Sequence, residues 1–480
     1  MTNKLFASIK DAETFLEEKF GKGKTFDFGM KRMYVKNLEV LCAYISGLVD
    51  SSSLTQMTSS LLPEDEEKIE DEKLYFEAYF NYFDCKKIED RDAYLLAILS
   101  GQVTFVTESG YCYFAELRSY PGRNPEEPDN EKVIRGARDG FTESIMQNAG
   151  LIRRRLRNSN LRFELHKVSA IGQTDVAISY MENIVNEELV GKIRKRLSEI
   201  HHDGLTMTDK SLEEWLFKQK FHPVPFVRYT ERPDIVAAHL LEGHVAIVVD
   251  TSPSVILVPV TIFHLLQHAE EYRQAPAVGT FIRFLRYIGT TMSLLLLPIW
   301  YLFATNESLL PKALSFLGSD EKSNVPLLLQ VFIADMGIEF LRMAAIHTPT
   351  PLSTAMGLVA GVIIGQIAID VGLFSPEVVL YVAVAAIFTF IIPSYELSIS
   401  VKLFRLMLLA ATGIGGENGL FIGFFLLFSY LCSLRPLEAP YMWPLVPFFP
   451  KAMLRVLIRF PMTEDALRPY IVASKQRKRS

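Results

Sequence analysis

Residues 287–304 read YIGTTMSLLLLPIWYLFA, eighteen positions without a charged side chain. A helix of this length rises about 27 Å at 1.5 Å per residue, close to the ~30 Å hydrocarbon core of a bilayer. Pro298 is compatible with such a helix, because packed neighbours satisfy the backbone groups that a proline leaves free. The stretch therefore predicts a membrane-spanning helix, and it separates two unlike halves of the chain.

The charge distribution changes at this boundary. Over all 480 residues, 49% are apolar, 22% are charged and the net charge is -5, values near those of an average soluble protein. Charges are dense up to about Glu271 and scarce from Tyr287 to Leu434. The mild net charge gives no electrostatic reason to expect a nucleic acid partner. We predict a soluble amino-terminal half followed by an α-helical polytopic membrane domain over 280–434.

The flanks of the first span indicate its orientation. Arg283 and Arg286 precede it, whereas Asn306 and Glu307 follow it. Since basic residues favour the cytoplasmic side of a membrane, we expect the soluble half in the cytoplasm. The first residues, MTNKLFASIKDAETF, contain no apolar core of a signal peptide, in agreement with that side.

A basic amphipathic tail is expected over 435–480, ending in KQRKRS. Its charge predicts a carboxy terminus on the cytoplasmic side, which requires an even number of spans. Tyr441 and Trp443, just before the basic residues, are predicted as anchors at the membrane interface.

A second apolar run, Val325 to Ile346, carries Asp335, Glu339 and Arg342. Spacings of four and three place these polar side chains on one face of a helix. Ionisable groups within a membrane line a water-filled path or pair with one another. Both interpretations stay open: a functional path, or a structural arrangement in which Glu339 and Arg342 form an ion pair and Asp335 bonds a neighbouring helix.

The third run, Thr354 to Leu373, combines two features. Small residues every fourth position predict a ridge for close helix packing; these are Gly357, Gly361 and Gly365. On an adjacent face the side chains change from apolar to polar, as along a narrow conduction path. We predict as pore-lining Val362, Gln366, Ile369 and Asp370. Ordinary packing, with Gln366 bonded across a helix interface, is the alternative.

Two further runs leave the span count between four and six. Val378 to Ile392 is short and ends before a proline. Leu403 to Leu434 is too long for one upright span and too short for two, and GIGGEN interrupts it, so one tilted helix and a pair of half-helices are both compatible with it. Lys402 and Arg405 are predicted on a loop that shares the cytoplasmic face with the amino terminus.

The soluble half contains an internal similarity. LLAILSGQVTFVTESGYCYFAEL surrounds Gly101, and AAHLLEGHVAIVVDTSPSVILVPV surrounds Gly243. Each consists of a helix end, a glycine stop and two strands. We predict two related α/β lobes over 1–118 and 160–272, joined by a connecting segment with a basic helix over 119–159.

Known catalytic and metal-binding patterns are missing from the sequence. It contains no HExxH, GxSxG or kinase signature, and its four cysteines are far apart. RGARDG lacks the spacing and the lysine of a phosphate-binding loop. A cluster of arginines is interpreted as a solvated helix end or as a site for phosphate or acidic groups: Arg153, Arg154, Arg155 and Arg157. We expect no enzyme activity, cofactor or metal.

Four separated motifs carry a resemblance to a known family: EEPDNEKVIRGARDGFTESIMQNAGLIRRRL, PVPFVRYTERPD, DTSPSVILVPV and GLVAGVIIGQIAID. Their order and spacing resemble the A subunit of the GerA-type spore germination receptors, from about Glu126 to the tail. FDFGMKRM and ELRSYPGRNPEEPD are more similar to a sporulation-associated paralogue of that subunit than to the nutrient receptors.

The resemblance implies a location in the inner membrane of the endospore, with the amino-terminal domain in the spore core. It implies a homo-oligomer, a pentamer by expectation, that encloses an ion-releasing pore. It also implies a second multi-spanning membrane protein as partner. A subunit of the dipicolinate release machinery is an alternative within this resemblance.

Three classes of function follow. The leading hypothesis is an oligomeric ion channel subunit of the germination system. A secondary transporter is disfavoured, because the membrane runs show no inverted repeat. A non-conducting scaffold or sensor, in which the soluble lobes bind a ligand and the helices anchor them, is the third.

Overall fold

The computed structural model describes residues 4–35, 38–61, 86–88, 90–119, 131, 133, 135–219, 221–309, 324–347, 365–461, 463, 468–472 and 474–476. The chain forms two compact units. The first, an α/β unit, comprises Met1–Lys220, Val227–Pro259 and Met462–Ser480, and the second, a helical unit, comprises Phe221–Phe226 and Val260–Pro461.

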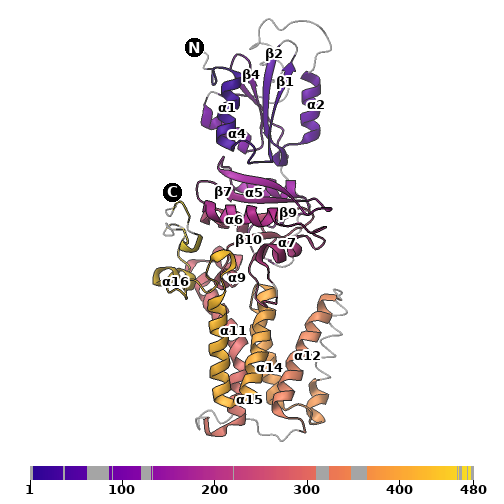
Figure 1. Ribbon diagram of the computed structural model, residues 1–480, viewed down its shortest axis with the longest axis vertical. Coiled ribbons are helices and arrows are strands. Elements are labelled where there is room, and N and C mark those ends of the chain that lie inside the picture. Colours follow the sequence, from indigo (N-terminus) through magenta and orange to yellow (C-terminus); the bar gives the residue numbers. More distant parts are fainter. Residues whose placement is uncertain are drawn as a thin grey trace. The chain divides into compact units, whose positions relative to one another are not determined.

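The first lobe of the α/β unit is an antiparallel sheet with helices on both faces (Figure 1). Its strands lie in the order β1-β2-β4-β5-β3. Helices α1 and α4 cover one face, where Leu16 and Ile98 are buried, and α2 covers the other through Met57. The bounds are α1 Ile9–Phe20, β1 Phe28–Val35, β2 Leu38–Ile45, α2 Ser51–Leu61, β3 Lys86–Ile88, α4 Arg91–Leu99, β4 Val103–Thr107 and β5 Cys112–Ala115.

The second lobe contains five strands in the order β6-β7-β9-β10-β8. Its central strand β9 is buried along its whole length, as expected for an apolar run covered on both sides. The bounds are α5 Ile145–Arg155, β6 Leu161–Val168, β7 Thr174–Met181, α6 Glu187–Ser198, α7 Thr208–Phe217, β8 Arg228–Thr230, α8 Pro233–Glu242, β9 Val245–Val249 and β10 Val255–Val258.

The two sheets have the same topology, which is the structural counterpart of the internal sequence similarity. Each strand of the second sheet takes the place of its counterpart in the first. Val245 follows Val103, and Gly243 follows Gly101, by the same interval of 142 positions. Both glycines have positive φ, 88° and 103°, so the left-handed helix stop expected from the sequence is present in both lobes.

The carboxy-terminal tail is divided between the two units. Residues 462–480 pack with the α/β unit, where the Arg468 guanidinium donates to the Leu241 carbonyl at 2.7 Å and the Lys475 amide to the Ile184 carbonyl at 2.8 Å. The part before Met462 belongs to the helical unit. The tail predicted as one segment over 435–480 is therefore two segments, because backbone hydrogen bonds hold its end to the second lobe.

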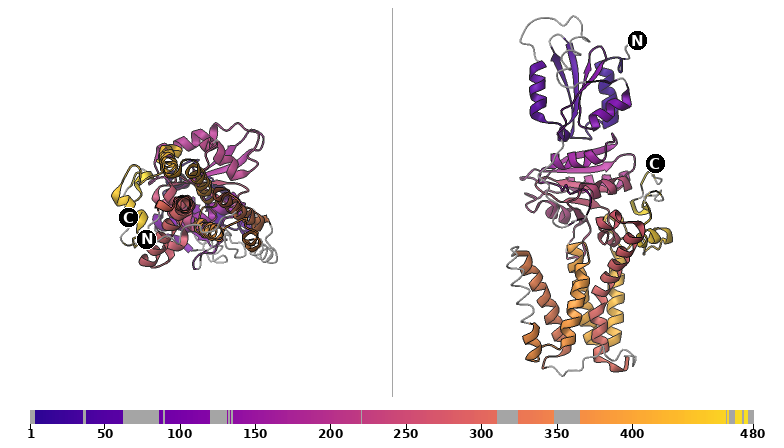
Figure 2. Two further views of the ribbon diagram at one scale, coloured as in Figure 1. Left: turned by 90° about the horizontal axis from the view of Figure 1, so that it is seen from below. Right: turned by 180° about the vertical axis from the view of Figure 1, so that it is seen from behind.

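The helical unit contains long apolar helices that run side by side (Figures 1 and 2). In the described part of the chain, α11 and α15 are long and apolar enough to cross a membrane, and α14 is apolar but shorter. Residues 365–370 are also helical. The bounds are α9 Ile262–Leu265, α10 Ala269–Arg273, α11 Pro276–Thr305, α12 Leu327–His347, α14 Pro376–Phe390, α15 Tyr395–Ser433 and α16 Pro450–Leu457.

Helix α15 reverses direction within its length. Gly416 has φ 55° and ψ -134°, a backbone conformation that glycine adopts without a steric penalty. The ring centroids of Phe404 and Tyr430 lie 6.2 Å apart, whereas a straight helix would separate these positions by about 39 Å. The arms 395–415 and 417–433 are therefore antiparallel. Of the two arrangements compatible with the sequence, the structure contains the broken pair.

Candidate functional site

The polar face of α12 meets basic side chains on α15. Arg405 donates to the Asp335 carboxylate at 2.6 Å. The Lys402 ammonium lies 3.1 Å from Glu339 Oε2 and 3.6 Å from Asp335 Oδ1. Because Asp335, Lys402 and Arg405 are buried, these ion pairs form in a medium of low dielectric constant, where an unpaired charge is costly.

Arg405 also connects this cluster to two other helices. It donates to the Ser293 carbonyl on α11 and to the Thr389 hydroxyl on α14, each at 3.0 Å. The Ser293 and Thr389 hydroxyls lie 2.7 Å apart and bond to each other. One guanidinium thus joins α11, α12, α14 and α15, and its hydrogen bonds fix the spacing of four helices.

The remaining charge of the cluster, Arg342, pairs within α12. It donates to Glu339 at 2.6 Å and to the Ser398 hydroxyl at 3.3 Å, and it lies 5.0 Å from the Tyr395 ring centroid. We call these five residues the ion-pair network: Asp335, Glu339, Arg342, Lys402 and Arg405. Two acids and three bases give it a formal charge of +1.

This geometry matches the structural interpretation of the α12 stripe. Glu339 and Arg342 form an ion pair, and Asp335 bonds a neighbouring helix. The prediction that Lys402 and Arg405 lie on a loop is wrong, since both are inside α15 and almost fully buried. They occupy a helix because the α12 acids neutralise them. The sequence signal for this buried pairing was the presence of two cations in an apolar run. The acids that pair with them lie 63 to 70 positions away in the sequence.

The residues predicted to line a pore lie outside the ion-pair network. Gln366 and Asp370 are exposed, Ile369 is half-buried, and the Gln366 amide donates to the Asp370 carboxylate at 2.9 Å. Among the described residues, no atom lies within 4 Å of the position that a Cβ atom would occupy at Gly365. Gly357, Gly361 and Val362 lie outside the described residues.

A short segment from the soluble half of the sequence, 221–226, folds with the helical unit. His222 Nδ1 lies 3.1 Å from the Tyr430 hydroxyl on the second arm of α15. The Ser400 hydroxyl on the first arm donates to the Pro223 carbonyl. The segment therefore contacts both arms, and Ser400 lies two positions from Lys402 of the ion-pair network.

Another buried cluster surrounds the start of α11. The Glu271 carboxylate accepts from Arg283 at 2.8 Å and pairs with Arg286. Arg283 also donates to the carbonyls of Arg455 and Val456, at 3.0 and 3.1 Å. The two arginines that indicated orientation are thus buried pairing residues, and Arg283 connects the start of the first span to α16.

The arginine cluster near residue 155 is neither fully solvated nor arranged as a phosphate site. Arg153 is completely buried and donates hydrogen bonds to both carboxylate oxygens of Asp27, at 3.0 to 3.1 Å, while Arg155 pairs with Asp139 at 2.6 Å. The Arg153 pair joins the two lobes of the α/β unit, since Asp27 immediately precedes β1 and Arg153 lies on α5.

The described residues contain no group of three or more His, Cys, Asp or Glu side chains that could hold a metal ion. Burial raises the pKa of both the Cys42 and Cys112 thiols to about 12, so neither is a ready nucleophile at neutral pH.

Comparison with known proteins identifies the family of this chain. The family model described as "Bacillus/Clostridium GerA spore germination protein" matches residues 14–471. The chain belongs to the GerA family. Stage V sporulation protein AF of Bacillus subtilis is 48% identical over 470 residues, covering 97% of this chain and 95% of that protein. The sporulation-associated branch expected from the sequence is confirmed by this similarity.

Other GerA family members are more distant. Spore germination protein KA of Bacillus subtilis is 29% identical, covering 98% of this chain and 88% of that protein, and GerLA of Bacillus cereus is 30% identical, covering 79% and 78%. The crystallised N-terminal domain of the A subunit of the Bacillus megaterium spore germinant receptor GerK3 is 25% identical, with a TM-score of 0.42, covering 54% of this chain and 97% of that domain. Family membership supports a role in spore germination, and with α11 and α15 a membrane location in the spore.

Proposed function

We propose that this GerA family protein is a membrane subunit of the endospore germination system that assembles as a homo-oligomeric ion channel, a pentamer, and releases ions from the spore core. The observation that carries the proposal is the contrast between two polar stripes. The α12 charges are paired inside the chain, whereas Gln366 and Asp370 project from the helical unit and bond only to each other among the described residues.

Exposure of Gln366 and Asp370 to lipid would cost free energy, and burial of the pair in an oligomer would remove that cost. A carboxylate facing lipid near mid-membrane costs at least ~2.5 kcal/mol, so Asp370 requires water, a protein partner or the headgroup zone. In a symmetric ring, Asp370 repeats as an acidic ring that attracts cations. Val362, proposed as the apolar constriction, lies outside the described residues, so its role stays a prediction.

The tail supports the proposed orientation. Residues 462–480 belong to the same compact unit as the amino-terminal lobes, which supports a chain that leaves and re-enters one side of the membrane. The number of crossings between Val260 and Pro461 is then even, and the antiparallel arms of α15 account for two of them. We place the α/β unit in the spore core and a second multi-spanning membrane protein beside the helical unit.

The test is cation flux through purified protein reconstituted in liposomes, together with its mass in detergent by native mass spectrometry. We expect a closed ring and a cation flux that Asp370→Asn lowers several-fold. Glu417→Gln, which removes an exposed acid at the turn of α15, is the matched control and leaves the flux unchanged. A monomer without flux contradicts the proposal.

A non-conducting scaffold or sensor is the second candidate. The pairing of Asp335 and Glu339 with cations favours it, because paired charges give α12 less of a free ionic lining. A stable ring that passes no ions in liposomes identifies this function. Measuring dipicolinate efflux in the same liposomes distinguishes a subunit of the dipicolinate release machinery, which passes dipicolinate in place of cations.

A further inference from the structure

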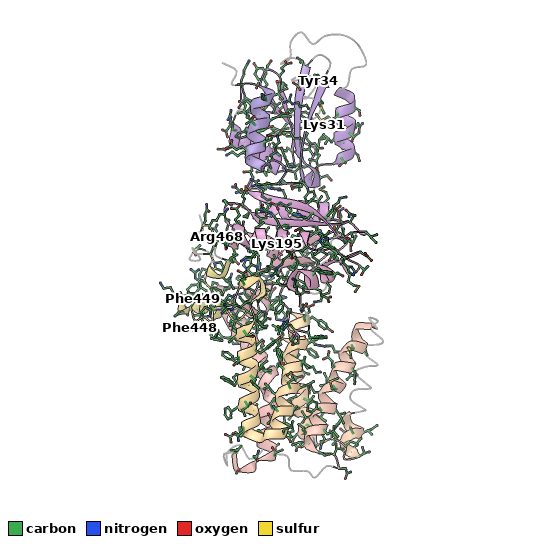
Figure 3. All side chains as sticks on the ribbon, viewed as in Figure 1. Lys31, Tyr34, Lys195, Phe448, Phe449 and Arg468 are labelled. Carbon is green, nitrogen blue, oxygen red and sulfur yellow. The ribbon has the colours of Figure 1, made fainter. Side chains whose placement is uncertain are left out.

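An apolar surface remains exposed around α16 in the helical unit. Phe448 is 64% exposed, and Phe449, Leu454 and Ile458 are also exposed. Figure 3 shows Phe448 and Phe449 at the outer edge of the helical unit, near α16. Phe448 and Phe449 immediately precede α16, on which Leu454 is exposed while Val456 is buried.

The residues predicted as interfacial anchors are not part of this surface. Tyr441 and Trp443 are buried, and Phe226 packs against the Tyr441 ring at 6.3 Å. They stabilise the fold of the helical unit and are unavailable to lipid. The phenylalanines a few positions later have the exposure that an anchor needs.

Hydrogen bonds fix α16 beside the start of α11. The Tyr287 hydroxyl and the Arg283 guanidinium donate to the Val456 carbonyl at 3.0 and 3.1 Å. The Arg459 amide donates to the Thr280 hydroxyl at 3.1 Å. Because Tyr287 is the first residue of the chargeless eighteen-residue run, α16 lies where α11 enters the hydrocarbon core.

Charge indicates which kind of surface covers these side chains. Residues 444–461 contain Lys451, Arg455 and Arg459 and no acidic residue. Lys451 is exposed, and a spacing of three places it on the same face of α16 as Leu454. Aromatic and aliphatic side chains beside basic ones at the edge of a span are typical of contact with acidic lipids.

We propose that residues 446–458 form an interfacial anchor, in which Phe448 and Phe449 insert at the headgroup–acyl boundary and Lys451 binds the headgroups of acidic lipids. The anchor fixes the height of the α11 start in the bilayer through the Val456 hydrogen bonds. It depends on the membrane location of the helical unit and is independent of ion conduction.

The experiment uses the full chain in nanodiscs, with a nitroxide label introduced through Phe448→Cys in a Cys85→Ser, Cys432→Ser background. Relaxation by oxygen, which concentrates in the bilayer, is compared with relaxation by a water-soluble nickel complex. In phosphatidylglycerol nanodiscs we expect oxygen to dominate at residue 448. Tyr34→Cys, on an exposed side chain of the α/β unit, gives the aqueous reference, where the nickel complex dominates.

Lys451→Glu tests the headgroup contact. A basic residue near an acidic membrane surface is worth about fivefold in the equilibrium of membrane binding, so this substitution lowers the equilibrium constant for insertion of residue 448 by at least that factor in phosphatidylglycerol. In phosphatidylcholine nanodiscs the same substitution has no effect. A label at residue 448 that matches residue 34 overturns the proposal, and one protected from both reagents overturns it by showing a protein partner on this surface.

Discussion

Arg405 holds several helices of the helical unit together. It pairs with Asp335 on α12 and also bonds α11 and α14. Arg405→Leu leaves a buried carboxylate with only the Lys402 ammonium nearby, at 3.6 Å. Breaking a buried ion pair in this way costs about 3–5 kcal/mol. We expect a clear loss of thermal stability in detergent, measured by the temperature at which the protein aggregates.

Two further variants separate pairing from packing. Asp335→Leu combined with Arg405→Leu removes both charges and recovers most of the lost stability. Arg435→Leu, on an exposed arginine of the same unit, has little effect. If the double variant is as unstable as Arg405→Leu, the ion pair does not explain the loss.

His244 makes the stability of the α/β unit depend on pH. Burial lowers its pKa to about 4, opposed by the hydrogen bond to the His239 carbonyl and assisted by the nearby Arg228 charge. The unfolded chain binds this proton near pH 6.5, whereas the folded protein does not until about pH 4. Stability therefore falls as pH decreases from 6.5 to 4, by about 3 kcal/mol at most.

Urea unfolding of a soluble fragment, residues 1–259, measures this dependence. The soluble half is predicted to fold by itself as two α/β lobes, and a cooperative transition tests that expectation at the same time. His244→Gln removes the titrating group, so its stability changes less over the same pH range. If the free energy of unfolding changes equally with pH in the two proteins, His244 is excluded as the cause.

At this scale the sequence indicated the local pair of Glu339 and Arg342 but not the partners on another helix. The spacing of Asp335, Glu339 and Arg342 was sufficient to place them on one helical face. Lys402 and Arg405 were assigned to a cytoplasmic loop because basic residues favour that side of the membrane, and no local pattern shows a partner for them on another helix. The pairing depends on tertiary packing, which spacing along one helix does not contain.

The reversal of α15 is the element on which the arrangement of the last helices depends. Cysteines at Phe404 and Tyr430 should be joined by a short bismaleimide, since the two rings are in contact. Cysteines at Ile414, beside the turn, and at Tyr430, near the far end of the second arm, are about 20 Å apart along the helix axis and should not react with it. Mobility on a denaturing gel distinguishes the products. Cross-linking of neither pair would indicate a continuous helix.

Other elements were predicted to different degrees. The glycine stops at Gly101 and Gly243 follow from local chemistry, so they could be predicted from the sequence. GIGGEN marked an interruption but did not select between a tilted helix and a broken pair, because the backbone torsions of one glycine, Gly416, decide it. The order of the strands in each sheet depends on long-range pairing and lay beyond the local pattern.

At the scale of the whole molecule, the packing of residues 462–480 with the lobes predicts that both ends of the chain lie on one side of the membrane. Cysteines at Tyr34 and Gln476, both exposed, should react with a membrane-impermeant maleimide from the same side of inverted vesicles. A cysteine at Ile414, at the tip of the α15 arms, should react only from the other side. Labelling of positions 34 and 476 from opposite sides would mean an odd number of crossings.

The ion-pair network also has a consequence for how the protein is made. Asp335 and Glu339 leave the ribosome before Lys402 and Arg405, which follow them by 63 to 70 positions. An uncompensated ionic side chain at the centre of a span costs about 2.5–3.5 kcal/mol during membrane integration. Helix α12 of the nascent chain therefore carries this penalty until the first arm of α15 is synthesised. A chain that stops before Tyr395 retains an acidic helix in need of cations, and such incomplete products are the ones that membrane proteases should remove first.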